Sequence, residues 1–111
     1  MDSDLIMDQT VVHDGLGRVQ VVVRLGGVVD LATQPKLRRA LDEALAVRAV
    51  AEVVVDLEDL VLLDSTGIAT LVGAYRAGAE AGVVVRVRHP RGMVQRVLEI
   101  TGVLKALDGH A

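Results

Sequence analysis

The chain has 111 residues, which is enough for one domain with its own hydrophobic core and too few for two. Hydrophobic residues make up 51% of it, but it contains no Phe or Trp and only one Tyr, so the core must consist of Val, Leu, Ile and Ala. The net charge of −3 and the scarcity of aromatic residues argue against nucleic-acid binding. The absence of cysteine excludes disulfides and thiolate metal or redox sites.

No apolar run reaches the roughly 18 residues that a membrane-spanning helix needs, because charged residues interrupt every valine-rich stretch. The first residues lack the basic and then apolar layout of a signal peptide, so we expect a cytoplasmic protein without membrane insertion. The histidines are scattered along the chain and form no ligand pattern. We therefore expect neither a metal nor another cofactor.

Segments of strand and helix character alternate from the beginning of the chain, which is typical of a compact α/β domain. Residues 1–111 are accordingly interpreted as a single domain. Two strands are predicted at roughly Leu5–His13 and Arg18–Leu25, joined by a tight turn at Gly15–Gly17. A helix is predicted from about Pro35 to Arg48, with Thr33 as its cap.

A third strand is predicted at Glu52–Leu57, followed by an acidic turn at Glu58–Asp59 and an apolar stretch that leads to Asp64. The second helix begins there and ends at Gly82. Residues at helical spacing predict its core-facing side, namely Ile68, Leu71, Val72, Tyr75 and Ala79.

A fourth strand is predicted at Val83–Arg88 and a third helix at roughly Arg91–Thr101. The tail Val103–Asp108 is expected to form only an abbreviated terminal element.

Apolar and polar residues alternate in the strands, so that one face of the sheet is apolar and the other is charged. Parallel strands covered by helices on both faces do not alternate so clearly. The alternation therefore predicts a two-layer domain with helices mainly on one face, and it argues against a doubly wound fold. On the charged face we expect Arg24, Asp56 and Arg86 to pair.

The order of elements makes the last three strands parallel, so their carboxyl ends share one edge of the sheet. Three segments follow these strands: Gly26–Asp30, Asp64–Gly67 and His89–Arg91. In the second of them an acid, two hydroxyls and a glycine replace an apolar run at the start of a helix. Ser, Thr and Asp are preferred helix caps, but a hydroxyl at a helix N-terminus is also well placed to accept a phosphate.

Three segments of the sequence, Gly27–Thr33, Val54–Leu57 and Leu63–Ile68, resemble the successive motifs of the STAS family in its anti-sigma factor antagonist branch. The resemblance extends from about Val19 to Gly102. It implies a STAS-like α/β fold with a mixed, mostly parallel sheet. It also implies a partner switch, in which the unphosphorylated antagonist binds an anti-sigma factor that is a serine kinase and thereby releases the sigma factor. Phosphorylation by that kinase ends binding, and a serine phosphatase restores it.

By this resemblance Ser65 matches the phosphorylated serine, and Thr66 is the adjacent alternative. Val28 stands where members of the family often have Glu. The second helix also has an outward side of small, uncharged residues, which either meets a partner or packs against a neighbouring helix. The expected partner-binding residues are Asp30, Asp64, Ser65, Thr66, Gly67, Ala69, Thr70 and Gly73.

An enzyme with Ser65 as nucleophile, His89 as base and Asp30 as orienting acid is the main catalytic alternative. The residues around Ser65 lack the Gly-x-Ser-x-Gly pattern of a nucleophile elbow, so we expect no catalytic residues. The other alternative is a STAS protein that does not switch, either an adaptor in a lipid-transport complex or a scaffold in a signalling assembly.

Overall fold

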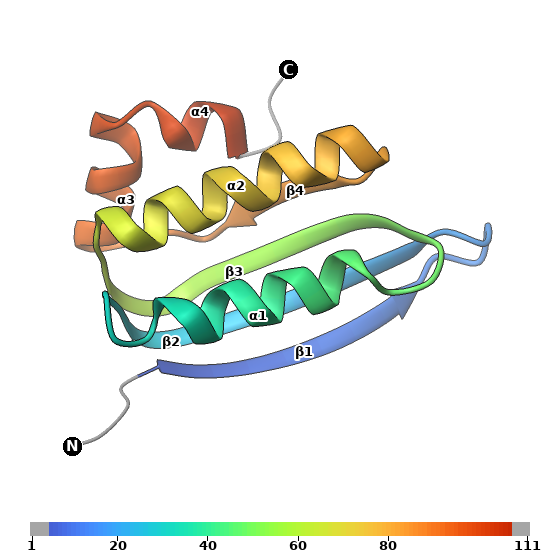
Figure 1. Cartoon of the computed structure of the whole chain (residues 1–111), viewed down its shortest axis with the longest axis horizontal. Coiled ribbons are helices and arrows are strands. Elements are labelled where there is room, and N and C mark those ends of the chain that lie inside the picture. Colours follow the sequence, from blue (N-terminus) through green and yellow to red (C-terminus); the bar gives the residue numbers. More distant parts are fainter. Residues whose placement is uncertain (1–4, 108–111) are drawn as a thin grey trace.

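The strands form one sheet in the order β1-β2-β3-β4, with helices packed around it (Figure 1). The structure is a computed structural model that describes residues 5–107. The elements in chain order are β1 (Leu5–His13), β2 (Val19–Val29), α1 (Gln34–Leu45), β3 (Val50–Leu63), α2 (Ser65–Ala81), β4 (Val84–Arg88), α3 (Gly92–Ile100) and α4 (Val103–Leu107). The pair β1–β2 is antiparallel, whereas β2–β3 and β3–β4 are parallel. The predicted mixed, mostly parallel sheet is therefore confirmed.

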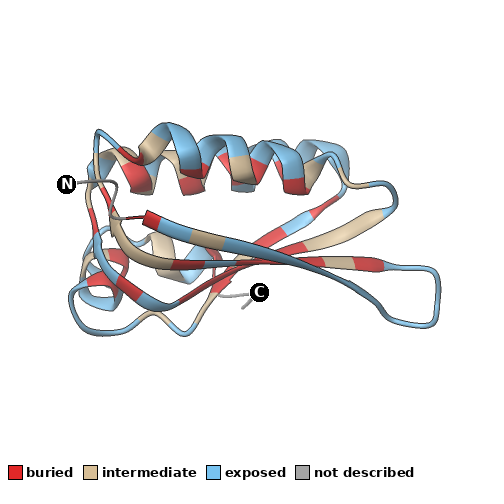
Figure 2. Ribbon diagram, turned by 90° about the horizontal axis from the view of Figure 1, so that it is seen from below, coloured by how far each residue is buried: buried red, intermediate tan, exposed pale blue. Residues whose placement is uncertain are grey.

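Helices α1 and α2 lie side by side over one face of the sheet, and α3 and α4 lie on the β4 side of α2 (Figure 1). The strand residues that face α1 and α2 are fully buried, including Val21, Val23, Val53 and Val55. Figure 2 shows the same division in the helices, which are buried toward the sheet and exposed on the opposite side. The two layers, one of sheet and one of helices, follow from the alternation of apolar and polar strand residues, because the helices cover the apolar face.

The opposite face of the sheet, called the back face below, carries ion pairs that cover buried valine side chains. Arg86 pairs with Glu52, and Arg88 Nε lies 3.0 Å from Asp56 Oδ2. Beneath these side chains Val22 and Val54 are buried, with 4% and 0% of their surface exposed. The charged face was predicted correctly, but these ion pairs differ from the predicted ones.

Arg24 does not pair with Asp56, although the two residues are register partners in neighbouring strands. Its guanidinium lies 3.9 Å from Asp8 of β1, because Asp56 is already bound by Arg88 from the other side. The expectation that Arg24, Asp56 and Arg86 form one group is therefore wrong.

The acidic turn predicted at Glu58–Asp59 is also wrong, since β3 continues through it as a single strand to Leu63. The β2–β3 register shifts between Arg24 and Gly26 and again between Gly27 and Val28, and each shift places an extra residue in β3. These irregularities let both strands bend and continue, so Gly26 to Val29 belong to β2 and not to a loop.

Only part of the predicted side of α2 faces the sheet: Leu71 is buried and Ile68 packs against the core, as predicted, but the rest of the buried side differs. Its buried residues are Gly67, Leu71, Ala74 and Gly78, whereas Tyr75 and Ala79 are exposed. A Cβ atom at Gly78 would lie 2.7 Å from Val85 Cγ2 of β4 and 2.6 Å from the backbone oxygen of Val83, so the helix is too close to the sheet there for any side chain. The larger apolar residues were used to predict the face, but the close approach selects the small ones.

The chain beyond α2 agrees with the predicted elements within a few residues. Gly82 ends α2 in the left-handed conformation, with φ of 77°, and β4 and α3 follow. The abbreviated terminal element is α4, whose Leu107 is buried, and Asp108 lies outside the described residues. Among the described helices, none combines the length and the apolar character required to cross a membrane.

Candidate functional site

The candidate site is the turn between β3 and α2, at the carboxyl edge of the sheet. The backbone amide of Asp64 donates to the carbonyl of Val29 at 3.1 Å, which joins the end of β3 to the end of β2. Helix α2 begins with the next residue, Ser65. The turn is therefore held by the sheet on one side and by a long helix on the other.

Asp64 is the cap of α2. Its Oδ1 accepts hydrogen bonds from the backbone amides of Thr66 and Gly67, at 3.0 and 3.1 Å, and from the Thr66 hydroxyl at 2.6 Å. The bond from the Thr66 hydroxyl is the main cause that lowers the pKa of Asp64 below 3.8, and the amides of Gly67, Thr66 and Leu31 lower it further. The carboxylate is thus ionised at neutral pH and fixes the start of the helix.

Ser65 takes no part in this cap. It is the first residue of α2 and is exposed, and its hydroxyl has no hydrogen-bond partner among the described residues. The hydroxyl of Thr66 is half-buried and bound to Asp64. Capping needs only Asp64, so the Ser65 hydroxyl is left free for an external group, at the positive end of the helix dipole.

Asp30 lies on the neighbouring turn, between β2 and α1, and its carboxylate is used locally. Its Oδ1 accepts from the amides of Ala32 and Thr33, both at 3.0 Å. Thr33 occupies the cap position of α1, as predicted, but its hydroxyl does not cap the helix. It donates to the carbonyl of Val28 at 2.9 Å and accepts from the Asp30 amide, so it closes the turn.

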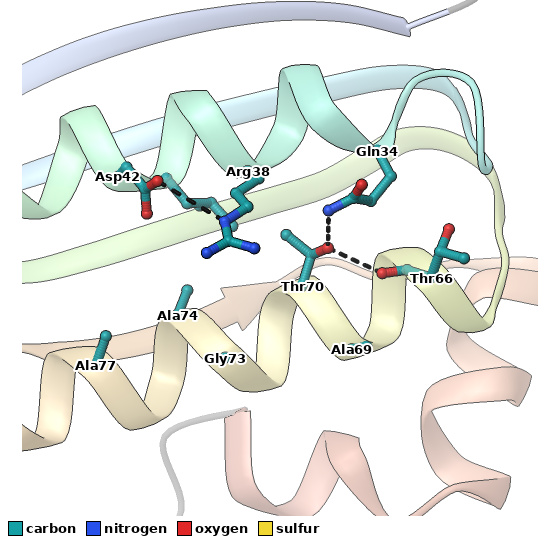
Figure 3. A pocket seen from close by; sticks show the side chains of 10 residues that line it. Gln34, Arg38, Asp42, Thr66, Ala69, Thr70, Gly73, Ala74 and Ala77 are labelled. Carbon is teal, nitrogen blue, oxygen red and sulfur yellow. Dashed lines mark hydrogen bonds and ion pairs between the residues drawn. The ribbon is translucent and has the colours of Figure 1, made fainter.

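The small side of α2 borders a groove of about 430 Å³ between α1 and α2 (Figure 3). Gln34 of α1 donates to the Thr70 hydroxyl at 2.7 Å, and Thr70 in turn donates to the carbonyl of Thr66. Ala69 and Gly73 are exposed, and a Cβ atom at Gly73 would meet nothing within 4 Å. The two helices therefore do not close over this side of α2.

The opposite wall of the groove belongs to α1 and was not identified from the sequence. Gln34, Arg38 and Asp42 line it, and Arg38 Nε lies 3.9 Å from Asp42 Oδ2 (Figure 3). A signal was present, since these residues recur at a spacing of four along one side of a helix. Nothing in the sequence showed that this side would face α2.

The catalytic alternative is not supported by the side-chain contacts. His89 Nδ1 lies 3.7 Å from Asp56 Oδ2, and the Asp30 carboxylate faces its own turn.

Asp56, Glu58 and His89 come together as a set of residues that could hold a metal ion, which the sequence did not reveal. Burial alone would raise the pKa of Asp56, but hydrogen bonds from the Glu58 amide and from Arg88, with nearby positive charge, lower it. The Asp56 carboxylate is therefore already neutralised by Arg88, which supplies the positive charge that a bound metal ion would bring.

The relation to known proteins agrees with this geometry. A family model of the STAS domain matches residues 9–110. The chain belongs to the STAS family. This confirms the family and the fold that the three sequence motifs predicted.

Relatives of this STAS chain include proteins named as anti-sigma factor antagonists. It is 30% identical, over 78% of its own length and 74% of the relative, to the anti-sigma F factor antagonist of Paenibacillus polymyxa. It is similar in structure to an anti-sigma factor antagonist from Mycobacterium paratuberculosis, with a TM-score of 0.68 and 29% identity, covering 92% of this chain and 83% of the other. The phosphorylated form of SpoIIAA, a Bacillus cell fate determinant, shares the fold with a TM-score of 0.60 and 24% identity, at 93% and 92% coverage.

Proposed function

We propose that this STAS protein is an anti-sigma factor antagonist switched by phosphorylation of Ser65. Unmodified, it binds an anti-sigma factor that is also a serine kinase and so frees the sigma factor. Phosphorylation releases it, and a serine phosphatase restores binding. The observation that carries the proposal is the exposed hydroxyl of Ser65, which has no hydrogen-bond partner among the described residues and lies beside a cap that is complete without it.

The charge of the turn explains how a phosphate would act. A phosphoserine adds about 1.5–2 negative charges at neutral pH. It would stand next to the carboxylate of Asp64, whose lowered pKa keeps it ionised. A partner surface that covered the turn would have to desolvate both groups, and burying unpaired like charges is strongly unfavourable. Phosphorylation therefore favours release.

The groove beside Ser65 supplies the proposed contact surface. Thr66, Ala69, Thr70 and Gly73 form one wall of small side chains that extends from the turn along α2. Small residues allow the backbone or an apolar side chain of a partner to approach closely. An interface that includes both the turn and this wall is interrupted when the turn gains charge.

The switch is tested with candidate anti-sigma factor kinases and ATP, with the phosphate mapped by mass spectrometry. We expect the phosphate on Ser65, constitutive binding by Ser65→Ala and weak binding by Ser65→Glu. The matched control is Thr66→Val, which removes a hydroxyl that Asp64 already binds and should leave phosphorylation of Ser65 in place. An unmodified Ser65 together with normal binding by Ser65→Glu would contradict the switch and favour a non-switching adaptor or scaffold.

The contact surface is tested separately with Gly73→Arg. The position is exposed and open, so the arginine side chain should leave thermal unfolding nearly unchanged. Binding of the kinase should be lost, because the side chain fills the groove. A large drop in melting temperature would instead show that this wall is needed for packing between α1 and α2.

A further inference from the structure

The outer strand β1 is an open edge of the sheet. It pairs with β2 over all nine of its residues without a register shift, and no other described element lies on its outer side (Figure 1). Ile6 is 74% exposed, and Val11 and Val12 are 44% and 42% exposed. A long, regular and partly apolar edge strand is a template for pairing with another strand, and proteins usually protect such edges with charge, bulges or short length.

The other edge of the sheet is protected in this way. β4 has five residues, and two of them are the arginines that hold the ion pairs of the back face. In β1 between Ile6 and Val12 the only charged side chain is Asp8, which lies 3.9 Å from Arg24 of the same sheet. Any pairing through a sheet edge is therefore expected at β1.

The sequence of β1 is symmetric in polarity about Gln9. Two apolar residues, Ile6 and Met7, precede the polar centre, and two, Val11 and Val12, follow it. When two copies of the strand pair antiparallel with Gln9 opposite Gln9, Ile6 meets Val12 of the other copy and Met7 meets Val11. Each apolar side chain then has an apolar partner on the same face, which is the arrangement that stabilises paired strands.

Neighbouring registers lack this match. With Asp8 at the centre, two carboxylates stand directly opposite each other, which is unfavourable. With Thr10 at the centre, Asp8 meets Val12 and Ile6 meets Asp14, so apolar side chains face charged ones. In the Gln9 register Asp8 instead lies opposite the Thr10 hydroxyl, and each Asp8 keeps its own Arg24 nearby.

We infer that β1 is the surface through which two copies of this chain associate, by antiparallel pairing centred on Gln9. The two sheets become one continuous sheet, with the helices of both copies on the same face. One strand pair buries less than the roughly 1,200 Å² of a standard interface, so the dimer is weak and depends on concentration. Because the strands are antiparallel, the two Ser65 turns lie at opposite ends of the joined sheet and both stay accessible.

The register is tested by cross-linking, which is clean because the chain contains no cysteine. In Gln9→Cys the two sulfurs face each other across the twofold axis, at a separation that a disulfide can span. In the control Thr10→Cys each cysteine lies opposite Asp8, two positions from its counterpart. We expect mild oxidation to cross-link Gln9→Cys at least about tenfold faster than Thr10→Cys. Equal rates would overturn the inference.

The association itself is tested by sedimentation equilibrium over a range of protein concentrations. Ile6→Lys and Val12→Glu should each weaken self-association by about tenfold or more, since each places an unpaired charge in the interface twice. The double variant brings the introduced lysine of one copy opposite the introduced glutamate of the other and should restore the dimer. Leu16→Lys, at an equally exposed site in the turn after β1, is the control and should change nothing. A wild-type chain that stays monomeric at every concentration, or a double variant as weak as the single ones, would overturn the inference.

Discussion

Replacing Asp64 by alanine separates helix capping from the proposed switch. The substitution removes the acceptor of the hydrogen bonds from the Thr66 amide at 3.0 Å, the Gly67 amide at 3.1 Å and the Thr66 hydroxyl at 2.6 Å. Loss of such a cap costs about 0.5–2 kcal/mol of stability. Because the carboxylate accepts all of these hydrogen bonds at one oxygen, we expect the upper part of this range. For a chain of this length that corresponds to a fall of about 6–12 °C in melting temperature.

The measurement is urea unfolding, followed by circular dichroism, of the wild type and three variants. Asp64→Asn keeps an oxygen acceptor but loses the charge, so it should be destabilised less than Asp64→Ala. Ser65→Ala removes a hydroxyl without a described partner and should change the free energy of unfolding by less than about 0.5 kcal/mol. If Ser65→Ala were as unstable as Asp64→Ala, the serine would belong to the cap and our separation of the two residues would be refuted.

The same variants should differ in their response to acid. The folded state lowers the pKa of Asp64 below its ordinary value of 3.8, so the carboxylate stabilises the fold above that value. This contribution is lost as the pH falls through the lowered pKa. The difference in stability between the wild type and Asp64→Ala should therefore be full at neutral pH and shrink in strong acid. A difference independent of pH would show that the charge is unimportant.

Two further predictions concern packing and the back face. Gly67→Ala would place its Cβ atom 2.5 Å from Leu63, so it should cost about 1–3 kcal/mol in urea unfolding. Gly73→Ala, on the same helix but in open space, should instead stabilise by up to about 1 kcal/mol, and equal effects would contradict the close packing. Arg88→Met removes the guanidinium 3.0 Å from Asp56, so the pKa of that buried carboxyl should rise and acid unfolding should begin at a higher pH. An acid midpoint equal to that of the wild type would show that this ion pair contributes nothing.

The sequence was sufficient for the order of elements, for which face of the sheet each strand residue occupies, and for the place of the turn at Asp64 between β3 and α2. It could not assign tasks within the turn, because Asp, Ser and Thr all offer an oxygen that can cap a helix. The choice depends on backbone angles: Asp64 is extended, with φ of −92° and ψ of −176°, and directs its carboxylate at the first amides of α2. No residue pattern carries that information.

The two errors in the elements have a common cause. Side-chain type was used to predict position, but in both places the backbone path decides it. Glu58 and Asp59 are exposed as acids in a turn would be, yet they lie in a strand whose register shifts. The buried side of α2 begins with Gly67, which is buried because it has no side chain and so lets the helix approach Leu63. The register of β3 against β2 and the contact of Gly67 with Val29, 2.6 Å from where a Cβ atom would lie, both join residues far apart in sequence, and a local pattern does not encode them.

Asp64 connects two parts of the chain that are far apart in sequence, since its amide binds the end of β2 at Val29 and its carboxylate binds the start of α2. Ser65 is therefore presented by a preformed surface and not by a flexible segment. An enzyme that modified it would have to recognise the shape of the folded domain, because the residues that frame the hydroxyl are far apart in sequence. A short peptide copied from this region would contain the serine but not the residues, distant in sequence, that surround it in the folded domain.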